Sequence, residues 1–128
     1  MRWGLFVLRP LLRWYNGRKV LLWDSAHAML PHHGQGANTT VEDAFILAAL
    51  LAKARPDDLE PVLAHYQSLR QARTRKIRRS SWVTNGLLHL PDGPRLADLD
   101  RKMAQVPQDF AWIHEFDMER SLSGSPLL

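Results

Sequence analysis

The sequence predicts an α-rich fold in which one short sheet strand leads through a glycine-bearing loop into about three helices. Two observations predict it: apolar residues recur at helical spacing over two long stretches, and only one short apolar run, at 19–23, is typical of a buried strand. No internal repeat interrupts this order. We expect a lead-in segment at 1–18, a main body at 19–120 and a loose tail at 121–128.

The predicted strand, from Lys19 to Trp23, ends directly before an acidic residue, Asp24. The carboxyl end of a strand is where open α/β sheets present groups to a bound ligand. Gly34 and Gly36 follow in the next loop and permit positive φ or a close approach of the backbone to a ligand. We therefore expect a polar, planar or anionic ligand here.

The first helix is predicted at 40–54. The segment Asn-Thr-Thr at 38–40 is expected to open it, with unpaired amides that favour electron-rich ligand atoms. Residues 39–42 match a capping box, and apolar residues recur at helical spacing until an Arg-Pro pair stops the element. Glu42 and Asp43 are then interpreted as first-turn acids, which the helix dipole favours.

A second helix is predicted to begin after the two aspartates at 57–58, to take Pro61 in its first turn and to continue to about residue 80. Its apolar stripe consists of Leu59, Val62, Leu63, Tyr66, Leu69 and Ile77. The cluster of Pro, Asp and Gly at 90–94 predicts a turn. Residues 95–105 give a third, shorter helix, which a Val-Pro pair ends.

Composition favours a soluble protein without membrane spans: 45% of the residues are hydrophobic and 23% are charged. The apolar runs are far shorter than the roughly 18 residues of a spanning helix. The apolar amino-terminal run is interrupted at Arg9 and Pro10 without a small-residue cleavage site, so secretion is not expected. There is no cysteine, which excludes disulfides and fits a reducing compartment, so we expect a cytoplasmic protein.

One stretch carries a specific motif. Residues 23–27 are Trp-Asp-Ser-Ala-His, and Pro31, Gly-Gln-Gly-Ala-Asn at 34–38 and Glu-Asp-Ala at 42–44 follow. This stretch resembles the second flavin motif of the FAD-dependent aromatic hydroxylases, the single-component flavoprotein monooxygenases that include p-hydroxybenzoate and salicylate hydroxylases. Weaker likeness covers nearly the whole chain. The resemblance implies an α-rich fragment of an α/β FAD-binding fold.

The resemblance also implies a set of cofactor contacts. Asp24 would accept a hydrogen bond from a ribityl hydroxyl of FAD, and Pro31 would lie beside the isoalloxazine ring. Backbone amides at 36–38 would approach the pyrimidine edge, where fixed donors stabilise negative charge on the ring. Alternatives stay open: Asp24 as a cap, Pro31 as a turn proline, and glycines that only make a turn. The predicted FAD-binding residues are Asp24, Pro31, Gly34, Gly36, Ala37 and Asn38.

The implied activity is hydroxylation of a small aromatic molecule with NAD(P)H and O₂, in which the protein positions and shields FAD. No Gly-x-Gly-x-x-Gly motif occurs in the 128 residues. We therefore expect the C-terminal portion of a longer enzyme, inactive alone, with a missing N-terminal half or a second copy as partner. No catalytic residue is assigned. Trp23 stands where the family carries glycine, and its indole is expected to clash or force a shift.

Histidines near the motif suggest a metal site as an alternative, because imidazoles are common ligands of Zn²⁺ and Fe²⁺. We predict no metal, because the adjacent His32 and His33 cannot easily aim at one ion and no cysteine assists. His27 is expected to be packed and hydrogen-bonded under the loop. A place for His32 or His33 on the substrate side of the flavin stays a hypothesis.

A basic run and a pI near 10.0 suggest a function of another class, nucleic-acid binding. Solvation at the end of a helix explains the same charges, and no motif that reads DNA or RNA accompanies them. A third alternative is a helical interaction module without flavin. The basic run comprises Arg70, Arg73, Arg75, Lys76, Arg78 and Arg79.

Overall fold

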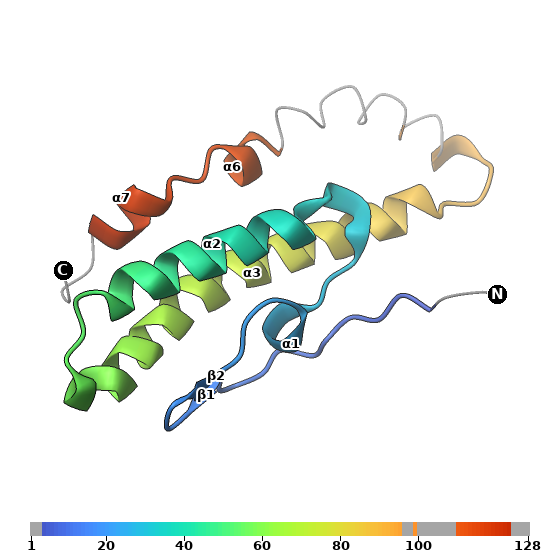
Figure 1. Cartoon of the computed structure of the whole chain (residues 1–128). Coiled ribbons are helices and arrows are strands. Elements are labelled where there is room, and N and C mark those ends of the chain that lie inside the picture. The colour runs from blue at the N-terminus through green and yellow to red at the C-terminus, as the bar shows by residue number, and fades with distance from the viewer. Residues whose placement is uncertain (1–3, 96–98, 100–109, 124–128) are drawn as a thin grey trace.

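The computed structural model of the chain describes residues 4–95, 99 and 110–123. Two long antiparallel helices lie side by side, with a small β-hairpin on one side and two short helices on the other (Figure 1). The elements are β1 (Tyr15–Asn16), β2 (Lys19–Val20), α1 (Asp24–His27), the 3₁₀ turn η1 (Pro31–His33), α2 (Gln35–Leu51), the 3₁₀ turn η2 (Pro56–Asp58), α3 (Leu59–Leu88), α6 (Ala111–His114) and α7 (Met118–Ser123). The α-rich prediction is confirmed, with five α-helices in the described ranges where about three were expected.

The predicted strand is shorter than expected and is not buried. Only Lys19–Val20 is a strand, and it pairs antiparallel with β1 across a turn in which Gly17 has φ 56°. Leu21 is 37% exposed. Both faces of a strand are buried only when a larger sheet and its helices cover them, and β1 is its sole strand partner among the described residues.

Helix α2 begins five residues before its predicted start. Gly34 takes a left-handed conformation, with φ 61° and ψ 20°, and connects η1 directly to α2. The hydroxyls of Thr39 and Thr40 lie inside the helix, where they donate to the carbonyls of Gln35, at 2.8 Å, and Gly36, at 2.9 Å. The predicted capping box is therefore wrong, because these hydroxyls bond carbonyls of the preceding turn rather than free amides.

Helix α3 extends eight residues beyond its predicted end, to Leu88. Four residues of its predicted apolar stripe are buried, and Leu59 and Leu69 are partly exposed. The main core lies between α2 and α3 and is closed by Trp14 from the lead-in segment and Leu122 from α7. Its buried members are Trp14, Ala26, Ile46, Leu50, Val62, Tyr66 and Leu122.

Some predictions fall partly outside the described residues. The third helix, predicted at 95–105, lies there almost entirely, as does the tail beyond Ser123. The β-hairpin spans the predicted boundary at 18/19, and α7 spans that at 120/121, so the division into three parts stays a prediction. None of the described helices is both long enough and apolar enough to span a membrane.

Trp23 adopts an unusual backbone conformation, with φ 60° and ψ −141°. This region is normally occupied by glycine, because a Cβ atom is strained there. The backbone is fixed on both sides: the Trp23 amide donates to Asp43 Oδ2 at 3.0 Å, and its carbonyl accepts from the amides of Ala26 and His27. Trp23 is 52% exposed, and the strain that the structure shows at this residue lies in its backbone.

Replacing Trp23 by Gly should give a more stable protein than replacing it by Ala, by about 1 kcal/mol, because both changes remove the indole and only glycine removes the strain. Urea unfolding of the two variants measures the difference. The same pair of substitutions at Val41, an exposed position inside α2, should show the opposite order, with alanine more stable by about 1 kcal/mol. If the glycine and alanine variants had the same order of stability at both positions, backbone strain at Trp23 would be contradicted.

Candidate functional site

Three of the six predicted cofactor-binding residues converge on one open groove. Asp24, at the start of α1, lines a hollow of about 440 Å³ together with Gly36 and Ala37, in the first turn of α2. Leu22, Trp23, Ser25 and Thr40 complete its wall. The groove therefore brings an acidic residue and the amino end of a 17-residue helix to one hollow.

The amino end of α2 is open to a ligand. The amides of residues 35–37 have no acceptor within the helix, and no side chain caps this end. A Cβ atom built on Gly36 would meet nothing within 4 Å. The partial positive charge of the helix end and these free donors favour an anionic or electron-rich ligand atom.

The other three predicted residues do not line the groove. Gly34 precedes α2, Pro31 begins η1, and Asn38 lies at the fourth helical position, where amides begin to bond inside the helix. The Asn38 side chain donates to Gln35 Oε1 at 3.3 Å. Pro31 and Gly34 instead shape the turn that leads into α2.

Sequence reasoning missed Ser25 and Thr40 as groove residues. Thr40 comes four residues after Gly36, so helical spacing puts the two on one face once the true start of α2 is known. Ser25 follows Asp24 directly, and its hydroxyl donates to the Leu22 carbonyl. Helical spacing was thus a usable signal, lost because the helix was predicted to begin too late.

A buried carboxylate, Asp43, lies behind the groove. It is 0% exposed and accepts three hydrogen bonds: from His27 Nε2 at 2.7 Å, from the Trp23 amide at 3.0 Å and from Arg70 Nε at 2.7 Å. The interpretation of Asp43 as a first-turn acid is wrong, because α2 begins eight residues earlier. The expectation that His27 is packed and hydrogen-bonded is confirmed.

Glu42 extends this network. Its carboxylate pairs with Arg70 Nη1 at 2.8 Å and with Arg73 Nη2 at 2.9 Å. Arg73 also donates to the carbonyls of Trp112, at 3.2 Å, and Ile113, at 2.7 Å, and so binds α6 to the helix pair. Like Asp43, Glu42 is a buried ion-pair partner rather than a first-turn acid.

The basic run does not form one solvated helix end. Arg70 is 0% and Arg73 8% exposed, and both lie in the middle of α3. Lys76 lies over the Trp112 ring at 3.9 Å, and Arg78 donates to the Leu8 carbonyl at 2.9 Å. The C-terminal dipole explanation is therefore wrong, because α3 continues well beyond these residues.

The charge state of Asp43 follows from its partners. Burial by itself raises the pKa of this carboxyl, but the hydrogen bonds from His27 and from the Trp23 amide and the charge of Arg70 together hold it below its ordinary value. The carboxylate is therefore ionised at neutral pH and acts as an acceptor. Burial and the Asp43 charge also raise the pKa of the neighbouring Tyr66, which keeps its proton.

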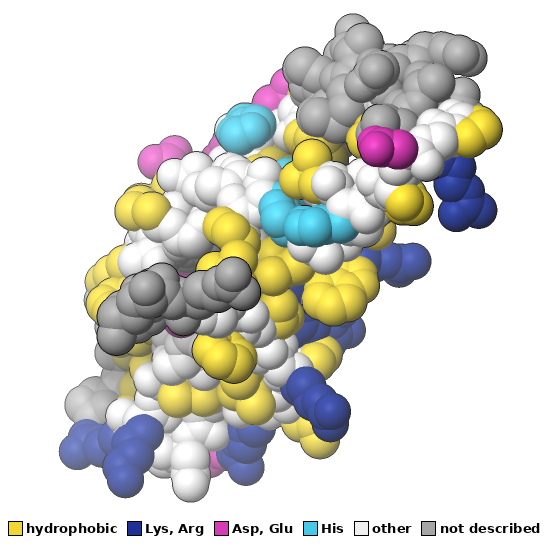
Figure 2. All heavy atoms as spheres, turned by 90° about the vertical axis from the view of Figure 1, so that its right-hand side faces the viewer, with side chains coloured by type: hydrophobic (Ala, Val, Ile, Leu, Met, Phe, Trp, Pro, Cys, Tyr) yellow, Lys and Arg dark blue, Asp and Glu magenta, His cyan; other side chains and the backbone are white. Residues whose placement is uncertain are grey.

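His32 and His33 lie in η1, at the other end of the loop. Figure 2 shows histidine side chains among hydrophobic ones on one face of the molecule. His32 Nε2 lies 2.9 Å from Asn85 Oδ1, and His33 Nε2 lies 3.1 Å from Ser80 Oγ. The His33 ring also packs on Phe110, with centroids 4.4 Å apart. Within the described part of the chain, no three His, Asp or Glu side chains are grouped to hold a metal ion.

Comparison with known proteins identifies the family. A model of the FAD binding domain matches residues 9–81, which include the whole groove and the Asp43 network. The chain belongs to the FAD binding domain family. This membership confirms the predicted resemblance and its implied fold, and it supports FAD as the cofactor.

Similar proteins are named as a monooxygenase and a hydroxylase. The chain is 42% identical to 3-amino-4-hydroxybenzoate 2-monooxygenase of Streptomyces platensis over 90% of its length, and 36% identical to salicylate hydroxylase of Pseudomonas putida over 94%. A salicylate hydroxylase structure, solved as a substrate complex, superposes with a TM-score of 0.76 at 31% identity over 88% of the chain. The chain spans 28–29% of the length of these relatives.

Replacing Asp43 by Asn should destabilise the FAD-binding domain by about 3 kcal/mol or more, because Arg70 would stay buried with less compensating charge. Chemical denaturation of the variant and the wild type measures this. Glu60→Gln is the matched control, since Glu60 pairs with Arg13 at 2.7 Å but both side chains are more than half exposed. That change should cost less than about 1 kcal/mol. Equal losses would show that the Asp43 network is not structural.

Stability should also depend on His33. Burial lowers its pKa below the ordinary 6.5, and His32 and His114 lower it further against a hydrogen bond with Ser80 that raises it. The folded state then binds a proton less readily than the unfolded state, so stability present above pH 6.5 is lost as the pH falls through the lowered pKa. His33→Gln should show a smaller loss between pH 8 and pH 5 in urea unfolding. If the wild type and the variant lost the same stability between pH 8 and pH 5, the loss would not come from His33.

Proposed function

We propose that this chain forms the isoalloxazine-side wall of the FAD site in an FAD-dependent monooxygenase that hydroxylates an aromatic or related small molecule with NAD(P)H and O₂. One observation carries the proposal: Asp24 and the open amino end of α2 lie on the same groove. The names of the relatives, 3-amino-4-hydroxybenzoate 2-monooxygenase and salicylate hydroxylase, support the aromatic substrate class.

The residues of the groove fit a flavin. The pyrimidine edge of the ring presents carbonyl oxygens and a nitrogen on which reduction places negative charge, and the amides of Gly36 and Ala37 with the helix dipole are suited to stabilise it. The missing Cβ of Gly36 permits a close approach of the ring edge. The carboxylate of Asp24, which lines the same groove, is suited to accept from a ribityl hydroxyl.

The geometry of the groove indicates what FAD and the residues of this chain would each contribute. FAD supplies the redox chemistry when bound, and the residues of this chain bind and orient it. Pro31 and Gly34 place the amino end of α2, and Asn38 continues its first turns. All six predicted residues therefore stay in the proposed cofactor site, three as wall residues or donors and three as its support.

We further propose that the adenine half of FAD, NAD(P)H and the substrate are bound by an N-terminal half outside these 128 residues, and that this half or another copy of the chain covers its apolar surface. Exposed apolar side chains, such as Trp82 at 62% and Phe6 at 84%, support a covering partner. The lack of cysteine agrees with a place in the cytoplasm. On this proposal the chain alone does not oxidise NAD(P)H.

Riboflavin, which carries the isoalloxazine ring and the ribityl chain without adenosine, tests the proposal. Titration into the full ¹⁵N-labelled chain should shift the amide signals of Gly36 and Ala37. Asp24→Asn should weaken this binding roughly tenfold or more, because a hydrogen bond to a charged acceptor is lost. Asp92→Asn, at an exposed bend, should bind like the wild type. Unmoved signals at 36–37 with millimolar riboflavin, or equal affinities of all three proteins, would refute it.

A further inference from the structure

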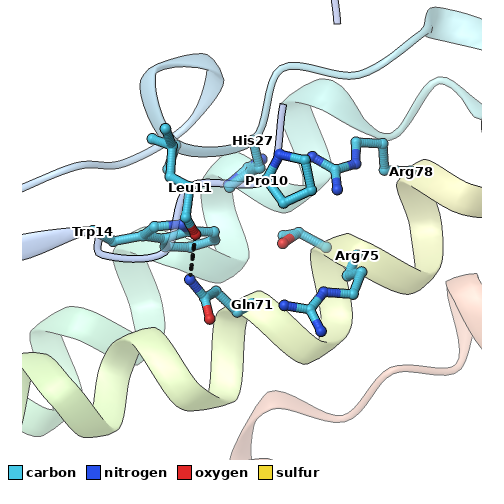
Figure 3. Close-up of a pocket in the computed structure, with 9 residues that line it drawn as sticks. Pro10, Leu11, Trp14, His27, Gln71, Arg75 and Arg78 are labelled. Atoms are coloured by element: carbon cyan, nitrogen blue, oxygen red, sulfur yellow. Dashed lines mark hydrogen bonds between the residues drawn. The ribbon is translucent and has the colours of Figure 1, made fainter. Parts of the chain in front are cut away.

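A second, smaller cavity lies behind the loop that carries Asp24. It measures about 20 Å³ and shares no lining residue with the groove. Figure 3 shows Trp14 and His27 on the side of the cavity opposite α3, whereas Gln71, Arg75 and Arg78 belong to α3 itself. The side-chain amide of Gln71 already has a hydrogen-bond partner, because it donates to the Leu11 carbonyl at 2.9 Å.

Two residues that line this cavity each have a buried nitrogen without a hydrogen-bond partner among the described residues. The nitrogens are Nε1 of Trp14 and Nδ1 of His27, and both residues are only 3% exposed. The two rings are neighbours, with centroids 5.4 Å apart. A buried polar group without a partner is costly, so each of these nitrogens is expected to bond a polar ligand.

The two nitrogens have opposite hydrogen-bonding character. An indole Nε1–H can only donate. His27 Nε2 lies 2.7 Å from Asp43 Oδ2, and because that carboxylate can only accept, Nε2 carries the proton and donates. Nδ1 of the neutral ring is then an acceptor. The missing ligand must therefore accept one hydrogen bond and donate another.

We propose that this cavity is a built internal water site, in which one water accepts from Trp14 Nε1–H and donates to His27 Nδ1. The volume of about 20 Å³ exceeds the roughly 10–15 Å³ that one water needs. Thr74 also lines the cavity; its hydroxyl hydrogen goes to the Arg70 carbonyl at 2.9 Å, which leaves oxygen lone pairs for the second hydrogen of the water. Three partners are typical of a buried water.

A small anion is the competing occupant, because Arg75 and Arg78 line the same cavity. Their positive charge would attract it. The lone pairs of His27 Nδ1 and Thr74 Oγ1 oppose it, since an anion cannot donate to them. Water satisfies both kinds of group, and an anion satisfies only the donors.

The water makes His27 a positioning residue. By donating to Nδ1, it holds His27 in the tautomer that donates through Nε2 to Asp43. The same Asp43 oxygen accepts from the Trp23 amide, which precedes Asp24 in the groove wall. The role in placing Asp24 rests on the proposed function, whereas the water site does not.

NMR of the full chain without flavin tests the water site independently of FAD binding. At pH 8, long-range ¹H–¹⁵N correlation should show His27 protonated at Nε2 and unprotonated at Nδ1. The indole Nε1–H of Trp14 should give a cross-peak to a long-lived water. A His27 ring protonated at Nδ1, or an indole without water contact, would overturn the proposal.

Trp14→Phe removes the indole donor and its own cross-peak, so the signal to follow is the cross-peak of the long-lived water to the His27 ring protons, which should disappear. Trp82→Phe, which changes an exposed indole, should leave the water signal and the His27 tautomer unchanged. If Trp14→Phe does not fold, the His27 tautomer and the indole–water cross-peak of the wild type still test the proposed water site. Chloride titration and a bromide-soaked crystal test the small anion as the occupant. A saturable shift of the Trp14 indole signal, with a bromide peak in the cavity, would identify an anion site and refute the proposed water site.

Discussion

The carboxylate of Asp43 is the group on which the rest of the structure depends. It is fully buried in α2 and accepts from α1, from the Trp23 backbone and from α3. A buried charge is tolerated only when it is paired and fully hydrogen-bonded, so every partner is needed to keep the others in place. One side chain therefore fixes α2 against α3 and against the preceding loop.

This arrangement sets the geometry of the groove. Gly36 and Ala37 lie about two helical turns before Asp43 on the same rigid helix, and Trp23 and His27 flank the wall residue Asp24. The separation between the acceptor at Asp24 and the donors of α2 thus depends on a short stretch of helix and on one carboxylate. Buried ion pairs often add little net stability over apolar packing, so this pair is better explained by the geometry that it imposes.

The sequence was sufficient for the two long helices, because their apolar periodicity is strong, and for the motif at 24–44. It was insufficient for Asp43, whose partner Arg70 is 27 residues away and leaves no local signal. A periodic signal existed nevertheless. Buried residues of α2 and α3 follow one spacing, Thr39, Asp43, Ile46 and Leu50 against Tyr66, Arg70, Arg73 and Ile77. Charged residues inside an apolar stripe on two adjacent helices predict a buried pair.

Trp23 has a structural feature that its place in the motif did not predict. Its bulk was expected to clash or force a shift, and this stays a prediction because Trp23 lines the groove; the structure adds an unusual positive φ at this residue. That conformation is maintained because the amide and carbonyl of Trp23 are both bonded, the amide to Asp43 itself. Backbone strain at Trp23 and the hydrogen bonds of Asp43 therefore oppose each other, and their balance determines where Asp24 enters the groove.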